Sequence, residues 1–143
     1  MSFDFKISNG DWVVGSNGDF QKVENTEKLI QDVLKIITFP LGKNIFFRWY
    51  GSPVSKTLVG TAFDMEFIST TASSQLMTAL ETLQRLQLEQ AKRQRVTPFE
   101  QIAAVQRVII ERNTVDPRYF SVVAKIATRA LTTVQAELQI NTL

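Results

Sequence analysis

Residues 105–140 read VQRVIIERNTVDPRYFSVVAKIATRALTTVQAELQI, and this stretch decides the fold class. It is rich in β-branched and aromatic residues, which favour strands. The segment 113–117, NTVDP, is a turn signal, and residues 132–140 alternate apolar and polar side chains. The pattern predicts three antiparallel strands near 105–112, 118–128 and 132–141.

The last of these strands carries few charges and no proline, so it would be an unprotected sheet edge unless a partner covers it. The connection 129–131 contains no Gly, Asn or Pro, and turn chemistry therefore does not fix the register of this strand. The residues in this part of the chain that we expect at a partner interface are Asp116, Arg118, Val134, Leu138 and Ile140.

Helical periodicity governs the middle of the chain. Leucines at helical spacing predict one long helix over 71–94, and an aliphatic face predicts another over 26–38, with Asn25 as its N-cap. Residues 53–70 are irregular and allow a short helix near 54–60. Thr97-Pro98-Phe99-Glu100 has the form of a capping box and predicts a short helical turn.

The N-terminal segment alternates around two turn signals, Asn9-Gly10 and Asn17-Gly18, which predict short strands near 3–7, 11–14 and 19–23. The expected architecture is therefore α+β, with an N-terminal β-hairpin region, a helical middle and a C-terminal three-stranded antiparallel sheet. No repeat or linker divides the chain, so a single domain over 1–143 is expected.

Composition removes several classes of chemistry. The 143 residues contain no cysteine and no histidine, which excludes disulfides, thiolate nucleophiles, Cys-ligated metals, Ser-His-Asp chemistry and zinc hydrolysis. No apolar run approaches the roughly 20 residues of a membrane span, and no signal peptide is recognisable, so we expect a soluble cytosolic product without membrane contact. Each carboxylate has a simpler role in a helix, cap or turn, and a peptidoglycan hydrolase is the least favoured function. We expect no catalytic, cofactor-binding or metal site.

The stretch 39–52, FPLGKNIFFRWYGS, follows the first helix and is expected to be a loop, because Pro40 disfavours helix at Phe39. Its aromatic and basic residues between 43 and 50 allow two interpretations. Alternate aromatics could cover the first helix while Arg48 faces outward, or the segment could bind single-stranded nucleic acid, which stays the alternative function. The residues in this stretch that we expect at a partner interface are Arg48, Trp49 and Tyr50.

Several segments in a fixed order resemble one protein family. They are Asp4-Phe5-Lys6-Ile7, Gly18-Asp19-Phe20, the helix text LIQDVLKIIT at 29–38, Pro40-Leu41-Gly42-Lys43 and Trp49-Tyr50-Gly51-Ser52. Together they look like the baseplate wedge family of contractile phage tails. Its members are also called sheath initiators or, historically, lysozyme-like wedge proteins, and related subunits serve bacterial contractile injection and secretion systems. The resemblance covers about residues 4–58 and is looser beyond.

The family carries a Glu-Pro-Arg motif before its C-terminal sheet, and this sequence departs from it. Its nearest counterparts are Asp116-Pro117-Arg118 and Phe99-Glu100-Gln101-Ile102, neither of which keeps all three motif residues. The resemblance implies a structural role without turnover, located in the virion baseplate after assembly in the host cytoplasm. It implies wedge proteins and the tail sheath protein as partners, with hub or tube proteins as further candidates, and no nucleic acid.

Overall fold

The computed structural model describes residues 2–58 and 65–141. It is a mixed α+β structure with N-terminal strand pairs, a helical middle and a C-terminal antiparallel sheet, which confirms the expected fold class. In chain order its elements are β1 (Asp4–Phe5), β2 (Ile7–Ser8), β3 (Asp11–Trp12), β4 (Lys22–Val23), α1 (Asn25–Thr38), α2 (Val54–Leu58), α3 (Met65–Ala91), the 3₁₀ turn η1 (Pro98–Glu100), β5 (Ile102–Arg112), β6 (Tyr119–Thr128) and β7 (Thr133–Asn141).

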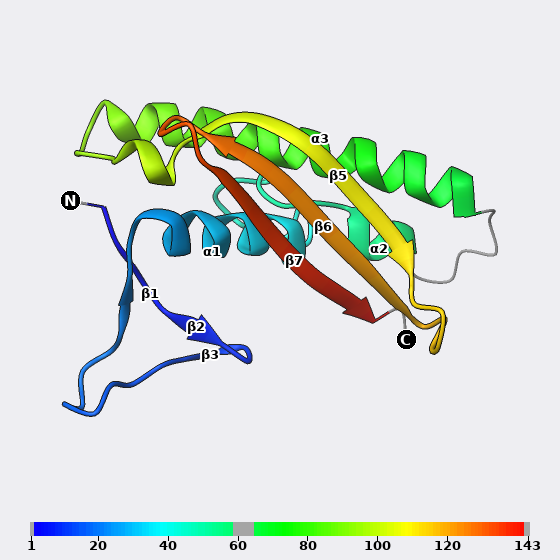
Figure 1. Ribbon diagram of the computed structural model, residues 1–143, viewed down its shortest axis with the longest axis horizontal. Helices are drawn as coiled ribbons and strands as arrows, with labels where there is room; N and C mark the ends of the chain where they lie inside the picture. Colours follow the sequence, from blue (N-terminus) through cyan, green and yellow to red (C-terminus); the bar gives the residue numbers. More distant parts are fainter. Residues whose placement is uncertain (1, 59–64, 142–143) are drawn as a thin grey trace.

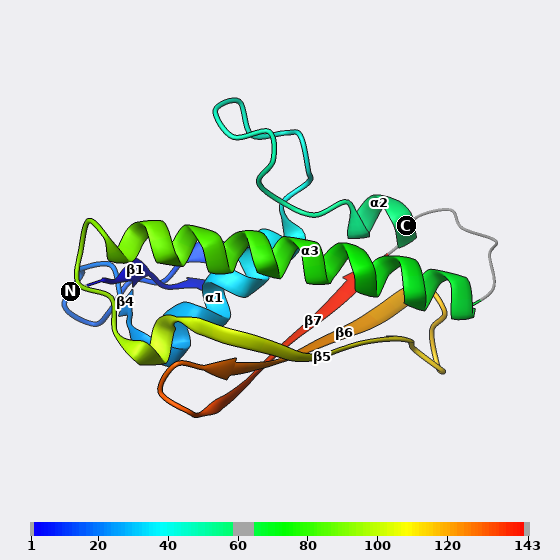
Figure 2. The ribbon, with the colours of Figure 1, turned by 90° about the horizontal axis from the view of Figure 1, so that it is seen from above.

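The core lies between two helices and one face of the sheet. The sheet has the strand order β5-β6-β7, and α1 and α3 lie against it on the same side (Figures 1 and 2). Strand β6 alternates strictly, burying every second residue from Phe120 to Thr128. Those side chains meet the aliphatic face of α1 and the inward face of α3, including Leu29, Leu76 and Leu80.

The three strands agree with the prediction, with β5 starting earlier, at Ile102. Register shifts interrupt β5 between Ile102 and Ala104 and between Val105 and Arg107. Such bulges move side chains from one face to the other, which explains why this strand shows no clean alternation in sequence. At the connection 129–131, Leu131 adopts a φ of +63° in place of a glycine, and β6 pairs with β7 without a shift.

Both long helices were predicted, but with errors at their ends. The long helix spans Met65–Ala91 rather than 71–94, and Ile68 continues its buried face toward the N-terminus. Asn25 is not the expected N-cap of α1. It has a φ of +53°, and its Oδ1 accepts a hydrogen bond from the hydroxyl of Thr97 at 2.7 Å. Helix α2 accounts for residues 54–58 of the expected short helix, and the rest of that prediction lies outside the described residues.

The N-terminal strands form two short antiparallel pairs, β1 with β4 and β2 with β3. Asn9 and Gly10 both have positive φ, +53° and +80°, as a type I′ hairpin turn requires. Gln31 of α1 fastens this region to the core, since its side chain bonds Asp4 and the carbonyl of Phe5 at 2.8 Å and the amide of Ile7 at 2.9 Å. Among the described residues, no helix combines the length and apolar character that a membrane crossing needs.

Candidate functional site

The segment from Phe39 to Ser52 forms a loop that projects from the molecule on the side of α3 away from the sheet (Figure 2). Its two ends lie side by side. The amide of Ser52 donates to the carbonyl of Phe39 at 2.9 Å, and the amide of Leu41 donates to Ser52 at 3.3 Å. We call residues 41–49 the projecting loop.

The projecting loop exposes the apolar side chains that were expected to pack inward. Ile45 and Phe46 are 87% and 85% exposed, and Phe47 and Trp49 are about half exposed. Within the stretch 45–50, Tyr50 packs against the core and makes an edge contact with Phe39 at 5.6 Å between ring centres. The expectation that alternate aromatics cover the first helix is therefore wrong for Phe47 and Trp49.

The cause lies in the backbone of the loop and in the sheet. Asn44 accepts the amides of both Phe46 and Phe47 at 3.0 Å through Oδ1, which bends the chain and prevents an extended strand. Most of the aliphatic face of α1 is covered by α3 and the sheet instead, and its partly buried residues Ile30 and Leu34 lie beside the N-terminal strands. Arg48 is exposed, in agreement with its expected outward orientation.

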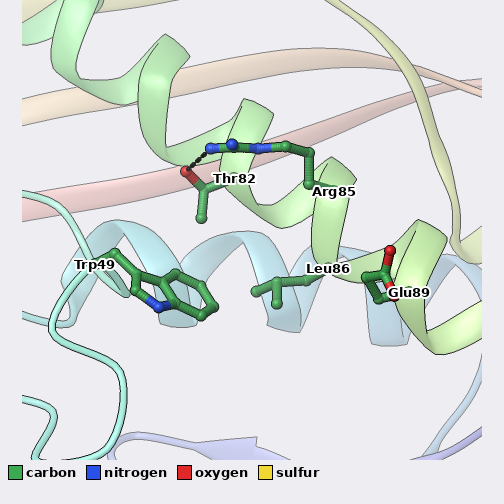
Figure 3. Close-up of a pocket in the computed structure, with 5 residues that line it drawn as sticks. All are labelled: Trp49, Thr82, Arg85, Leu86 and Glu89. Atoms are coloured by element: carbon green, nitrogen blue, oxygen red, sulfur yellow. Dashed lines mark hydrogen bonds between the residues drawn. The ribbon is translucent and has the colours of Figure 1, made fainter.

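A hollow of about 390 Å³ lies between Trp49 and the outer face of α3. Figure 3 shows the indole directed toward Leu86, with Arg85 and Glu89 on the helix beside it. The Arg85 guanidinium donates to the hydroxyl of Thr82 at 3.3 Å. The hollow thus has an apolar wall with one cation and one carboxylate at its rim, an arrangement suited to an apolar side chain with a polar neighbour rather than to acid–base chemistry.

A second apolar surface, which sequence reasoning did not identify, lies on the N-terminal strand pairs. Phe3, Phe5, Phe20 and Trp12 form a chain of edge-to-face contacts with ring centres 5.3 to 6.0 Å apart, and all four are exposed. Lys22 lies over the ring of Phe3, 4.3 Å from its centre. We call these four rings the N-terminal aromatic cluster. The sequence signal for this cluster was an aromatic residue in each of the three predicted N-terminal strands. Strands this short cannot bury so many large rings.

The predicted contact residues Asp116 and Arg118 lie together at the turn between β5 and β6. Their side chains form an ion pair of 2.7 Å, and the side-chain and backbone hydrogen bonds from Arg118 lower the pKa of Asp116 to about 2. Asn113 accepts the amides of Val115 and Asp116 and shapes the turn. Both members of the pair are accessible at this end of the sheet, but each already has the other as a partner.

The structure places the predicted residues of β7 in the core rather than on an open face. Val134 and Ile140 are buried and Leu138 is partly buried against the same core. Their side chains support the sheet from inside, so only the backbone edge of the strand is available to another chain.

That edge can be described residue by residue. The amide of Thr128 bonds to the carbonyl of Thr132 at 2.8 Å, and antiparallel pairs alternate between bonded and non-bonded. The even-numbered residues of β7 therefore bond to β6, while odd-numbered ones such as Gln135 and Gln139 direct their N–H and C=O outward. In the described sheet no strand lies beyond β7.

Among the described residues, the carboxylates do not assemble into a recognisable reaction centre. Asp4, Asp32, Glu89 and Asp116 each pair with a lysine or arginine. Glu100 is buried, and one of its oxygens accepts the amide of Thr97 at 3.0 Å, as the capping-box prediction requires. Over residues 2–58 and 65–141, no three acidic side chains gather as a metal ion would need.

Comparison with known proteins finds a likeness of fold and none of sequence. No family model matches the chain, and no curated protein matches it. Among solved structures, the fold is similar to the crystal structure, at 1.44 Å resolution, of a Geobacter sulfurreducens protein named "putative tail lysozyme". The TM-score is 0.61 over 82% of this chain and 90% of that chain, at 8% sequence identity. The fold of this chain is therefore one that also occurs in a protein named for a tail.

Proposed function

We propose that this chain is a structural subunit of a contractile tail baseplate wedge, working in the virion. The observation that carries the proposal is the fold shared with the tail-named protein from Geobacter sulfurreducens, in a chain whose N-terminal motifs resemble the wedge family. The proposed partners are other wedge proteins and the tail sheath protein. The role requires no turnover, and we propose that the chain does not hydrolyse peptidoglycan.

The sheet supplies a means of contact with the sheath. The outward N–H and C=O groups of β7 would pair with a strand of a sheath subunit, because strand addition gives directional main-chain hydrogen bonds. In the same arrangement, the ion pair of Asp116 and Arg118 would lie at the end of the sheet where β5 turns into β6. Polar groups of a partner could form hydrogen bonds with it there.

The edge can be tested without disturbing the core. Replacing Gln135 and Gln139 by proline removes two outward N–H donors, and proline is tolerated on an edge strand at positions that do not bond to the sheet. We expect this double variant to keep its secondary structure but to lose most binding to the sheath protein of the same particle. The matched control is Gln135→Thr with Gln139→Thr, which keeps both donors and should bind normally.

Particles assembled without the chain test the wider role. The proposal expects incomplete baseplates or tubes without sheath, and wild-type protein supplied in trans should restore both. Complete sheathed particles without the chain would refute it. Release of fragments from purified peptidoglycan, lost on substitution of a single Asp or Glu, would contradict the absence of turnover.

One observation favours a second candidate. Phe46, Phe47 and Trp49 are exposed, with Lys43 before them in the chain and Arg48 between Phe47 and Trp49. Aromatic rings beside cations are the arrangement used to bind single-stranded nucleic acid. Gel-shift titration with a labelled oligonucleotide separates the candidates, since binding of this kind weakens steeply with salt and would be lost in Phe46→Ser.

A further inference from the structure

Two apolar surfaces of this chain face solvent and lie apart from each other. The projecting loop presents Ile45, Phe46, Phe47 and Trp49, and the N-terminal aromatic cluster presents four rings in contact. Figures 1 and 2 place the loop behind α3, and the strand pairs lie along α1, where Asp4 and Ile7 contact Gln31 and Lys35. Clusters of this kind, rimmed by polar residues, are typical of protein contact sites.

The projecting loop holds its apolar tip in place. Asn44 fixes the amides of Phe46 and Phe47, the amide of Tyr50 donates to Phe47 at 3.0 Å, and the loop ends are bonded to each other. A tip that is already ordered loses little conformational freedom when it binds, which favours association through it.

The two surfaces carry opposite charge. Residues 39–58 contain the cations Lys43, Arg48 and Lys56 and no carboxylate. Residues 2–24 contain four carboxylates against two lysines. One of the four, Asp4, is already paired with Lys35 of α1, which leaves a smaller acidic excess among the exposed groups.

Charged residues also stand next to the apolar ones in sequence. Lys43 and Arg48 flank the apolar tip of the loop in sequence, and the exposed carboxylates of Asp11 and Asp19 directly precede the rings of Trp12 and Phe20. Lys22, which lies over the ring of Phe3, is itself a cation on the cluster. The attraction therefore depends on the excess of the acidic residues Asp11, Asp19 and Glu24 over Lys6 and Lys22.

We propose that the projecting loop of one copy docks on the N-terminal aromatic cluster of a second copy. Because the two surfaces differ, the contact is head-to-tail, and each copy can engage two neighbours, so that copies form a closed ring or an open chain. The proposal uses only this chain and does not depend on the tail role.

The contact is expected to be weak between two isolated copies. Each surface consists of a few side chains, well below the roughly 800 Å² per partner of a standard stable interface. Association should therefore need high protein concentration and should weaken as salt screens the rim charges.

Sedimentation velocity over a range of protein and salt concentrations tests the proposal. The loop variant is Ile45→Ser with Phe46→Ser, and the cluster variant is Trp12→Ser. We expect each to raise the dissociation constant about tenfold or more, since both remove central apolar contacts. The matched control is Val115→Ser with Leu131→Asn, which removes two side chains exposed by 91% and 95% outside both surfaces and should associate as wild type does.

A mixing experiment distinguishes this contact from any other. The loop variant keeps an intact cluster, and the cluster variant keeps an intact loop. The mixture should therefore form mixed pairs at concentrations where each variant alone stays monomeric. In the mixed pair, the loop of the cluster variant docks on the intact cluster of the loop variant. The pair therefore forms even if Trp12→Ser disturbs the hairpin of the cluster variant. A wild-type protein that stays monomeric throughout, a loop variant that still associates, or a mixture without mixed pairs would overturn the proposal.

Discussion

Gly51 lies where the two ends of the projecting loop meet, and its φ of +111° belongs to a region that other residues rarely adopt. A Cβ at this position would lie 2.5 Å from the carbonyl oxygen of Phe39 and 3.1 Å from the amide of Leu41. We expect Gly51→Ala to lower the free energy of unfolding by roughly 2–4 kcal/mol, measured by urea denaturation with an unchanged slope.

Gly42 provides the control for this substitution. It also has a positive φ, +83°, but a Cβ there would meet open space. Gly42→Ala should therefore cost only the backbone preference, roughly 1 kcal/mol. Equal losses in the two variants would mean that close approach at Gly51 does not matter.

At the level of single residues, sequence chemistry predicted what depends on local geometry. The positive φ of Gly10 and Gly18 at the predicted turns, the extended Phe39 before Pro40 and the bond from Thr97 to Glu100 are all confirmed. The exposure of Phe47 and Trp49 could not be predicted in this way, because it depends on whether distant strands cover α1 first. An aromatic side chain is buried only if its segment, rather than another one, covers the apolar surface of the core. The sequence of a short stretch does not show which segment does so.

Among the elements, α3 and β5 are joined by the buried side chain of Gln87, which is 4% exposed. Its Nε2 donates to the carbonyl of Glu100 and its Oε1 accepts the amide of Ile102, both at 2.8 Å. Gln87→Met would leave two buried backbone groups without partners, and we expect a loss of roughly 2–4 kcal/mol in the free energy of unfolding. Gln84→Met, which removes longer bonds at a half-buried site, should cost less than about 1 kcal/mol. If the two losses are similar, burial does not set the cost.

The attachment of the N-terminal strands to α1 should depend on pH through Asp4. Partial burial raises the pKa of Asp4, but hydrogen bonds from Lys35 and Gln31 outweigh it, and the net pKa is lowered. A lowered pKa in the folded state stabilises the fold above the unfolded value, about 3.9, and this contribution disappears as pH falls through the folded value.

We therefore expect Asp4→Asn to reduce the free energy of unfolding at neutral pH by about 0.5–1 kcal/mol, because the pair is partly exposed. The difference from wild type should close in acid, where both proteins carry a neutral side chain. Amide exchange at Ile7, whose N–H bonds to Gln31, would locate the effect. A gap that persists unchanged at low pH would contradict the assignment.

Element order and type were predictable because periodicity is strong in α1, α3, β6 and β7. Element ends were not, and each error has a local cause. Irregular spacing of apolar residues hides the first turns of α3, bulges obscure the pattern of β5, and Leu131 makes a turn without the usual residue. In each case tertiary contacts stabilise a backbone conformation that the local sequence does not favour.

At the scale of the whole molecule, helix α3 separates the two kinds of contact proposed for this chain. The projecting loop lies on one side of α3 and the sheet with its free edge lies on the other (Figure 2). Sites this far apart, with no shared partner residue, should contribute to binding independently. The sequence predicted an interaction role for both segments but could not show that they face opposite ways.

This arrangement predicts that the two contacts can be removed one at a time. Gln135→Pro with Gln139→Pro should abolish sheath binding and leave self-association unchanged, because β7 takes no part in the loop contact. Ile45→Ser with Phe46→Ser should do the reverse, and the combined variant should lose both by the sum of the separate changes. Sedimentation velocity reports self-association, and co-purification with sheath protein reports the edge. If the loop variant failed to bind sheath protein, the two contacts would share one surface. That result would contradict their separation by α3.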